Sequence, residues 1–175
     1  MGCSNKALVP LNGRPMIAWV IDRLLPQVGS VIINANSDHA SFAAMGYPVV
    51  ADTILNHRGP LAGLHSAMAR AKTPLIACVP CDAPMLPVDL VARLHAALAD
   101  ADIAVAKTPA SLQPTFVLCR TTLGESIEKY LAEGKYALRH WMKRHRCVEV
   151  DFSDEAEFAN INSPEDVARA EALLA

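Results

Sequence analysis

The chain has 175 residues, of which 52% are hydrophobic, and its 16 Lys and Arg residues nearly balance its 18 Asp and Glu residues. This length suits a single domain spanning 1–175 and is enough to bury a hydrophobic core. The net charge of −2 gives no basic surplus, and neither a signal peptide nor an apolar run long enough to cross a bilayer is recognisable, so we expect a cytoplasmic protein that binds neither nucleic acid nor membranes.

The first half of the sequence alternates expected helices and strands. A tight turn at Asn12-Gly13 precedes a helix over 15–24, whose apolar residues recur with helical spacing. Two short β-branched strands follow at 31–33 and 49–50. A second helix, over 60–71, completes this half.

The second half continues this alternation and opens with an apolar strand over 75–79. The expected elements that follow are a helix from Pro87 to 98, strands at 103–106 and 115–118, helices from 121 or 122 to 133 and over 137–145, a strand at 147–151, and a helix beginning at Ser163. Strands and helices in this order predict an α/β fold, a three-layer sandwich around a mostly parallel sheet.

The strand at 75–79 is followed by an acidic residue between two prolines. Asp82 has Pro80 before it and Pro84 after it. A continuous apolar run is typical of a buried parallel strand, and open α/β sheets bind their ligands beyond the carboxyl ends of such strands. Asp82 is therefore a candidate for contact with a metal or substrate. Alternatively, it is a turn residue that accepts backbone N–H bonds.

Two further expected strands run into polar residues, Asn34 and Asp52. The carboxyl ends of parallel strands lie along one edge of a sheet, so Asn34, Asp52 and Asp82 could converge on one crevice. Next to them, the small residues of 59–63 begin a helix. They permit close approach of a flat ligand such as a nucleobase or, alternatively, close packing of a helix on the sheet.

Polar residues near both ends of the chain complete the candidate set. Lys6 stands in a polar segment before the first apolar residues, although a single lysine is usually solvated. Asn160 and Asn162 share one face of an extended segment that precedes a helix N-terminus. They could bind a polar ligand together or serve as turn and cap residues.

Taken together and in this order, these segments resemble the molybdenum cofactor guanylyltransferases (the MobA family) over essentially the whole chain. The resemblance rests on Lys6, 11–15 (Leu-Asn-Gly-Arg-Pro), 34–36 (Asn-Ala-Asn), 59–63, 80–84 (Pro-Cys-Asp-Ala-Pro) and 158–164 with its two asparagines. It implies a Rossmann-like nucleotidyltransferase that transfers GMP from GTP to the terminal phosphate of molybdopterin, with Mg²⁺ and release of pyrophosphate. Other proteins of molybdenum cofactor biosynthesis would be its partners.

The same resemblance assigns roles to individual residues. Asp82 would hold Mg²⁺ against the α-phosphate and Lys6 would neutralise the triphosphate, which makes these two the expected catalytic residues. Asn34 and Asp52 would contact the nucleotide together with them. Such a reaction needs in-line positioning and neutralisation of charge rather than a side-chain nucleophile.

On the acceptor side, Asn160 and Asn162 would lie toward the phosphate of the pterin. Two alternatives to guanylyl transfer stay open. One is a relative that uses CTP or acts on a sugar phosphate, because base choice depends on a few contacts near 59–63. The other is a non-catalytic module that holds pterin or a partner protein on the side of the two asparagines.

The chain departs from the family pattern at its beginning. In the family a first strand leads into a glycine-rich loop that holds the nucleotide phosphates, and here only Met1-Gly2 matches the end of that loop. The loss of a central strand would leave a gap in the sheet and two exposed strand edges. We therefore expect little or no activity from this 175-residue form and activity from an N-terminally extended one.

Overall fold

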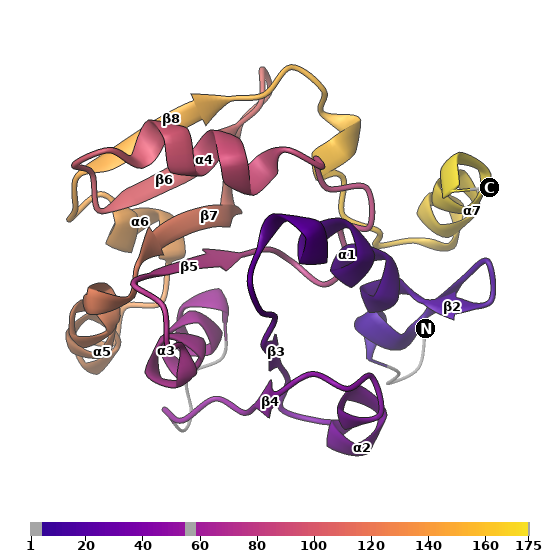
Figure 1. Cartoon of the computed structure of the whole chain (residues 1–175), viewed down its shortest axis with the longest axis horizontal. Coiled ribbons are helices and arrows are strands. Elements are labelled where there is room, and N and C mark those ends of the chain that lie inside the picture. The colour runs from indigo at the N-terminus through magenta and orange to yellow at the C-terminus, as the bar shows by residue number, and fades with distance from the viewer. Residues whose placement is uncertain (1–4, 55–58, 175) are drawn as a thin grey trace.

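The structure contains the helices and strands that the sequence predicts, and it adds two short strands at 10–11 and 14–15 and a helix at 39–43 (Figure 1). The computed structural model describes residues 5–54 and 59–174, so Met1-Gly2 lies outside the described residues. The strands are β1 (Pro10–Leu11), β2 (Arg14–Pro15), β3 (Ile33–Asn34), β4 (Val49–Val50), β5 (Leu75–Cys78), β6 (Ile103–Lys107), β7 (Leu112–Arg120) and β8 (Cys147–Asp151). The α-helices are α1 (Met16–Leu24), α2 (His39–Ala43), α3 (Pro60–Arg70), α4 (Leu90–Leu98), α5 (Gly124–Ala132), α6 (Leu138–Met142) and α7 (Pro164–Leu174). No helix in the described ranges has the length and apolar character needed to cross a membrane.

The largest sheet has the strand order β5-β7-β6-β8. β6 pairs antiparallel with β7 and parallel with β8, and β5 pairs antiparallel with β7. The α/β class is confirmed, but the expectation of mostly parallel pairing is wrong for two of the three pairings in this sheet. The reason is the link between β6 and β7, residues 108–111, which suits a hairpin and is too short for the crossover that parallel neighbours need.

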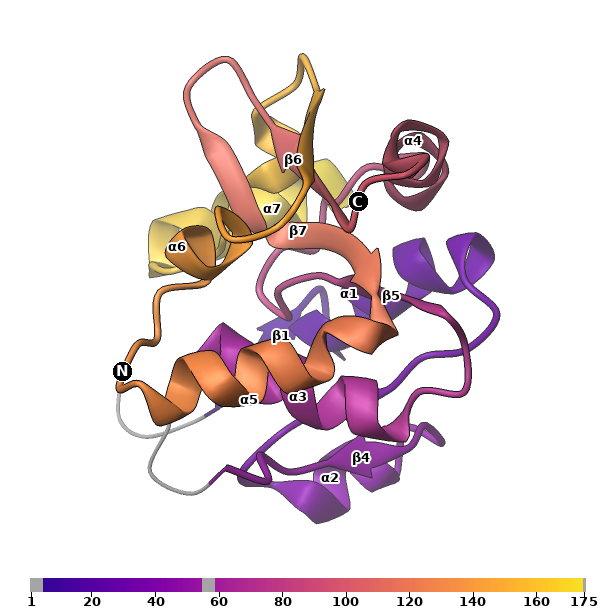
Figure 2. The same ribbon diagram turned by 90° about the vertical axis from the view of Figure 1, so that its left-hand side faces the viewer.

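Helices cover both faces of this sheet. Successive residues of a strand point to opposite faces, so Ile103 and Val105 of β6 join one hydrophobic cluster, and Ala104 and Ala106 join another. The first cluster includes residues of α3, α5 and α6, and the second includes residues of α4. Figure 2 shows α4 and α6 on opposite sides of β6 and β7. The expected three layers are therefore present.

β3 and β4 form a separate two-stranded parallel unit. Within the described part of the chain, neither of these strands pairs with β5. A cavity of about 1040 Å³ lies between β3 and β5, and its largely apolar lining includes Val20 of α1, Leu64 of α3, Ile33 and Ile76. In the described part of the chain, β3 and β5 therefore each have one edge without a partner strand.

The N-terminal hairpin packs beside the C-terminal helix. β1 and β2 pair around the turn at Asn12 and Gly13, whose φ angles of 46° and 76° match a two-residue hairpin turn of type I′. The backbone N–H of Asn12 donates to Glu171 Oε1 over 2.9 Å, and Asn12 Nδ2 donates to the Glu171 carbonyl over 3.0 Å. These contacts bring the beginning of the described chain close to α7.

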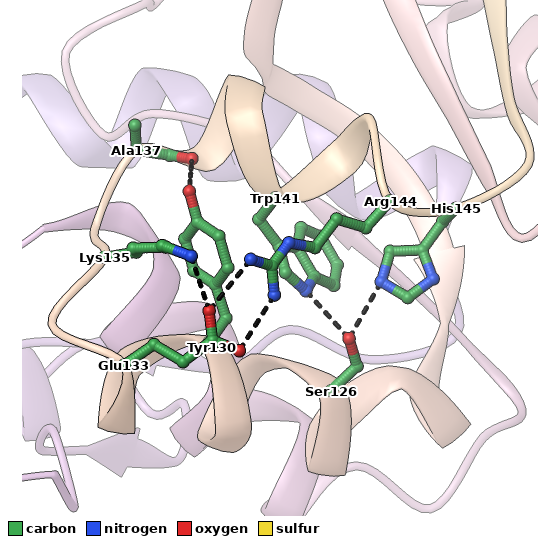
Figure 3. Close-up of polar contacts among 8 residues, drawn as sticks. All are labelled: Ser126, Tyr130, Glu133, Lys135, Ala137, Trp141, Arg144 and His145. Carbon is green, nitrogen blue, oxygen red and sulfur yellow. Dashed lines mark hydrogen bonds and ion pairs between the residues drawn. The ribbon is translucent and has the colours of Figure 1, made fainter.

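A polar network joins α5 to α6 (Figure 3). Ser126 Oγ accepts a hydrogen bond of 3.1 Å from Trp141 Nε1 and lies 2.9 Å from His145 Nε2. Arg144 donates to both carboxylate oxygens of Glu133 and is the main reason that the pKa of Glu133 falls to about 2. None of the candidate residues from the sequence takes part, so this network serves the packing of the two helices.

Candidate active site

Three distant segments of the chain meet beside Asp82. Lys6 Nζ donates to Asn162 Oδ1 over 2.6 Å, although these residues are 156 positions apart. The Ile161 backbone N–H donates to the Asp82 carbonyl oxygen over 2.8 Å. Lys6 is also close enough to Asp82 to lower the pKa of its carboxyl group. The structure therefore brings Lys6, Asp82 and Asn162 together.

Local hydrogen bonds fix the segments that carry Lys6 and Asn162. The side-chain oxygen of Asn5 caps the 3₁₀-helix Lys6–Leu8 by accepting a backbone N–H. Ser163 and Asp166 cap α7 reciprocally, because Ser163 Oγ accepts from the Asp166 N–H and the Asp166 carboxylate accepts from the Ser163 N–H. The same carboxylate accepts from the Asn162 N–H over 3.1 Å, so the helix cap also holds Asn162.

The Asp82 carboxyl group is half-buried and open to a ligand. Among the described residues, no side chain donates a hydrogen bond to it. Desolvation by burial raises the pKa of Asp82, while its own backbone N–H and Lys6 act in the opposite direction. A hard cation prefers carboxylate oxygens, and Mg²⁺ commonly uses one or two of them together with phosphates and water. Asp82 therefore fits the role of a ligand to a divalent cation.

A second polar group lies where β3 and β4 end. Asn34 is opposite Val50 in this parallel pair, and Asn36 and Asp52 each come two residues after these strand ends. Asn34 Nδ2 donates to Asp52 Oδ1 over 2.9 Å, and Asn36 Nδ2 donates to Asp52 Oδ2 over 2.8 Å. Asn36 Oδ1 in turn accepts from the Asp52 backbone N–H over 2.8 Å. Both oxygens of the Asp52 carboxylate are therefore held by side-chain donors.

Helix α3 packs directly against this second group. Gly63 faces the Asn34 side chain so closely that a Cβ atom at 63 would overlap Asn34 Oδ1. One turn further along, the buried hydroxyl of Ser66 accepts from the Thr53 backbone N–H over 2.9 Å and donates to the Ala62 carbonyl over 3.0 Å. The small residue at 63 thus makes room for a side chain of β3, which is the packing alternative for the segment 59–63.

The two polar groups are connected through one cavity. Asn34, Gly63 and Asp82 all line the cavity between β3 and β5, and Asp52 is joined to it through Asn34. The amide of Asn160 makes no hydrogen bond with the residues that the structure describes, although its carbonyl lies 3.5 Å from Asn162 Nδ2.

Asn36 and Ser66 belong to this polar group but are not among the candidate site residues predicted from the sequence. The spacing of Asn34 and Asn36 places both on one face of an extended segment, and this was the available indication for Asn36. Ser66 lies within a helix, where a single serine gives no such indication.

The chain matches a known protein family and its members over most of its length. A family described as a MobA-like NTP transferase domain matches residues 1–150. A molybdenum cofactor guanylyltransferase from Burkholderia ambifaria is 45% identical over 179 residues, which cover 96% of this chain and 87% of the relative. The protein of the same name from Shewanella loihica is 42% identical over 168 residues, which cover 94% of this chain and 86% of the relative.

Solved structures share the fold at lower identity. Molybdopterin-guanine dinucleotide biosynthesis protein A from Archaeoglobus fulgidus superposes with a TM-score of 0.80 at 20% identity, covering 98% of this chain and 91% of that one. A 2-C-methyl-D-erythritol 4-phosphate cytidylyltransferase from Thermus thermophilus gives a TM-score of 0.74 at 19% identity, covering 97% and 93%. At these identities the likeness establishes the fold, which these two proteins and this chain have in common.

Proposed function

Because the chain belongs to the MobA-like NTP transferase family, we propose that it transfers GMP from GTP to the terminal phosphate of molybdopterin and releases pyrophosphate. The observation that carries this proposal is the meeting of Lys6, Asp82 and Asn162 at one site. A cation, an open carboxylate and an amide suit a transfer between phosphates, which depends on positioning and on neutralisation of charge. The same proposal includes a cytoplasmic location beside other proteins of molybdenum cofactor biosynthesis.

In this proposal the acceptor phosphate attacks the α-phosphorus of GTP directly. A new P–O bond forms at that phosphorus while the bond to the leaving pyrophosphate breaks. Lys6 neutralises the triphosphate, and Asn34 and Asp52 contact the nucleotide, while Asn160 and Asn162 lie toward the acceptor. The hydrogen bond between Lys6 and Asn162 supports this division, because it links a residue of the triphosphate side to one of the acceptor side.

We propose that Asp82 holds Mg²⁺. When bound, this cation neutralises developing charge on the transferred group. No group of three His, Cys, Asp or Glu side chains within 5–54 and 59–174 could enclose a metal ion, so Asp82 would share the cation with phosphate oxygens and water. Burial and the neighbouring Asp82 raise the pKa of the Cys81 thiol, which keeps it protonated and leaves the carboxylate as the ligand.

Pyrophosphate release tests this function. An N-terminally extended form and the 175-residue chain are each incubated with molybdopterin, Mg²⁺ and either GTP, CTP or UTP, and the released pyrophosphate is quantified. We expect the extended form to release pyrophosphate with GTP and molybdopterin together and none when either is omitted. Release with CTP alone would replace guanylyl by cytidylyl transfer. Pterin binding without release from any nucleotide would favour a non-catalytic module.

A further inference from the structure

Asn36 contacts Asp52 at two points and contacts no other side chain by hydrogen bonds among the described residues. Its Nδ2 donates to Asp52 Oδ2, and its Oδ1 accepts from the Asp52 backbone N–H, each over 2.8 Å. One amide therefore sets both the backbone position and the carboxylate orientation of a single residue. This reciprocal contact is made directly beyond the paired ends of β3 and β4, where Asn34 lies opposite Val50 and the two chain segments run side by side.

The neighbouring Asn34 is held in a different way. Its Nδ2 donates to the Val50 carbonyl over 3.2 Å as well as to Asp52, and its side chain packs against Gly63. Asn34 is thus fixed by α3 and by the backbone of β4, and it holds one oxygen of Asp52. Asn36 is exposed and holds the other oxygen, so without it the carboxylate could turn away while keeping a single donor.

We propose that Asn36 is a positioning residue for nucleotide binding, which fixes the orientation of the Asp52 carboxylate and does not itself touch the nucleotide. This inference rests on the proposed function, in which Asp52 contacts the nucleotide. A carboxylate held before its ligand arrives loses less conformational freedom on binding. The loss of Asn36 therefore weakens binding although no contact with the ligand is removed.

Two substitutions at 36 separate positioning from support of the backbone. Asn36→Ala removes both contacts and is expected to weaken GTP binding about tenfold, because the freed Asp52 side chain must then be ordered when the nucleotide binds. Asn36→Asp keeps an oxygen that accepts from the Asp52 N–H but turns a second carboxylate oxygen toward Asp52, so we expect at least the same loss. Normal GTP binding by Asn36→Asp would assign Asn36 to the backbone alone and overturn the proposal.

The binding measurements use the full chain with GTP and Mg²⁺ in a calorimeter. Each variant is also titrated with guanosine, which carries no phosphate, so that a general effect of the added charge in Asn36→Asp is separated from the loss of orientation. The melting temperature is expected to change little, because an exposed contact contributes little to stability. A large fall in melting temperature with unchanged affinity would contradict a role in binding.

A double variant tests whether Asn36 acts through Asp52. Once Asp52 is replaced by Ala there is no carboxylate left to orient, so Asn36→Ala combined with Asp52→Ala should bind GTP as weakly as Asp52→Ala alone. A further loss in the double variant would assign a direct nucleotide contact to Asn36 and overturn the proposal.

The same binding measurements distinguish a failure of the proposed function from a failure of the positioning role of Asn36. GTP binding by Asp52→Ala at the wild-type affinity would remove the nucleotide role of Asp52, and the positioning role would fall with it. Weaker binding by Asp52→Ala but not by Asn36→Ala would overturn the positioning role and leave the proposed function intact. The ¹³C resonance of the Asp52 carboxylate without nucleotide provides a separate readout, and we expect Asn36→Ala to shift it. An unchanged resonance would also overturn the positioning role.

Discussion

Asp52 and Asp82 are carboxylates of one candidate site with opposite surroundings. Asp52 has a side-chain donor on each oxygen, from Asn34 and Asn36. Asp82 has none among the described residues, and burial raises its pKa. A carboxylate with both oxygens held presents a fixed shape, whereas a partly desolvated and open one gains most from a cation. The difference supports recognition of the nucleotide by Asp52 and cation binding by Asp82.

The strands that precede the two residues explain this difference. Asp52 follows β4, and the parallel neighbour β3 runs on into two asparagines that reach it. Asp82 follows β5, which has the antiparallel β7 on one side and the cavity on the other. No parallel neighbour within the described residues is paired with β5 to supply donors, so the Asp82 carboxylate stays open.

The largest expected effect comes from Asp82→Asn. The substitution keeps the shape of the side chain but removes the charge that would hold Mg²⁺, so pyrophosphate release should fall by about a thousandfold. Asp52→Asn should instead weaken GTP binding and leave the rate at saturating GTP closer to that of the wild type. Similar losses of rate in both variants would contradict the division of roles.

Gly63→Ala tests the Asn34 side of the Asp52 group. The added Cβ overlaps Asn34 Oδ1, so the asparagine must move away from Asp52, and we expect GTP binding to weaken about tenfold. Gly124→Ala is a matched control in another helix, because a Cβ there meets nothing within 4 Å. The control should bind GTP normally. Equal affinities of the two variants would show that the position of Asn34 is unimportant.

Replacing the two carboxylates should change the free energy of unfolding in different directions, which unfolding in denaturant measures. Asp52→Asn turns its amide N–H₂ toward the N–H₂ of either Asn34 or Asn36 and should lower the free energy of unfolding by about 1 kcal/mol. The pKa of Asp82 is raised on folding. Ionisation of Asp82 therefore destabilises the native state relative to the unfolded chain, and this cost is absent in acid, where the group is protonated in both states. Asp82→Asn should therefore leave stability at pH 7 unchanged or slightly higher, and this difference from wild type should vanish in acid. Destabilisation by both substitutions would contradict the contrast.

The smallest expected effect is a change in the pH profile of Lys6→Met. Lys6 lowers the pKa of Asp82, which must be ionised to hold a cation. Its removal raises that pKa, so the acid limb of kcat/KM should move to higher pH, in addition to any loss of rate. Lys129→Met is a control on α5, where the lysine pairs with Glu125, and its profile should match that of the wild type. An unmoved limb in Lys6→Met would separate Lys6 from Asp82.

Local patterns in the sequence predicted much of the fold. The apolar run at 75–79 appears as β5, and the expected strand at 147–151 matches β8. The direction of β7 differs from the expected one. The expected strands at 103–106 and 115–118 leave eight residues between them, and β6 and β7 are separated by four, and either link is too short for a crossover. The order of the elements along the chain favoured parallel pairing. The length of the link between two strands determines whether parallel pairing is possible.

The candidate site was less accessible to reasoning from local sequence. Lys6 and Asn162 are 156 residues apart, and no periodicity or spacing relates them, so only the resemblance to a family grouped them. The role of Asn36 depends on the register of β3 against β4. A shift by one residue would turn every side chain of the strand to the other face, and sequence pattern does not determine register at this precision for strands of two residues.

The break between β3 and β5 divides the described molecule into parts that no backbone hydrogen-bond ladder joins. The β3–β4 unit packs against the rest through helices such as α1 and α3. Units connected in this way open with their own free energies, which amide hydrogen exchange measures residue by residue. A ligand that contacts Asp52 on one part and Asp82 on the other links their opening. Nucleotide binding should therefore slow exchange in β3 and β4 far more than in the buried β6.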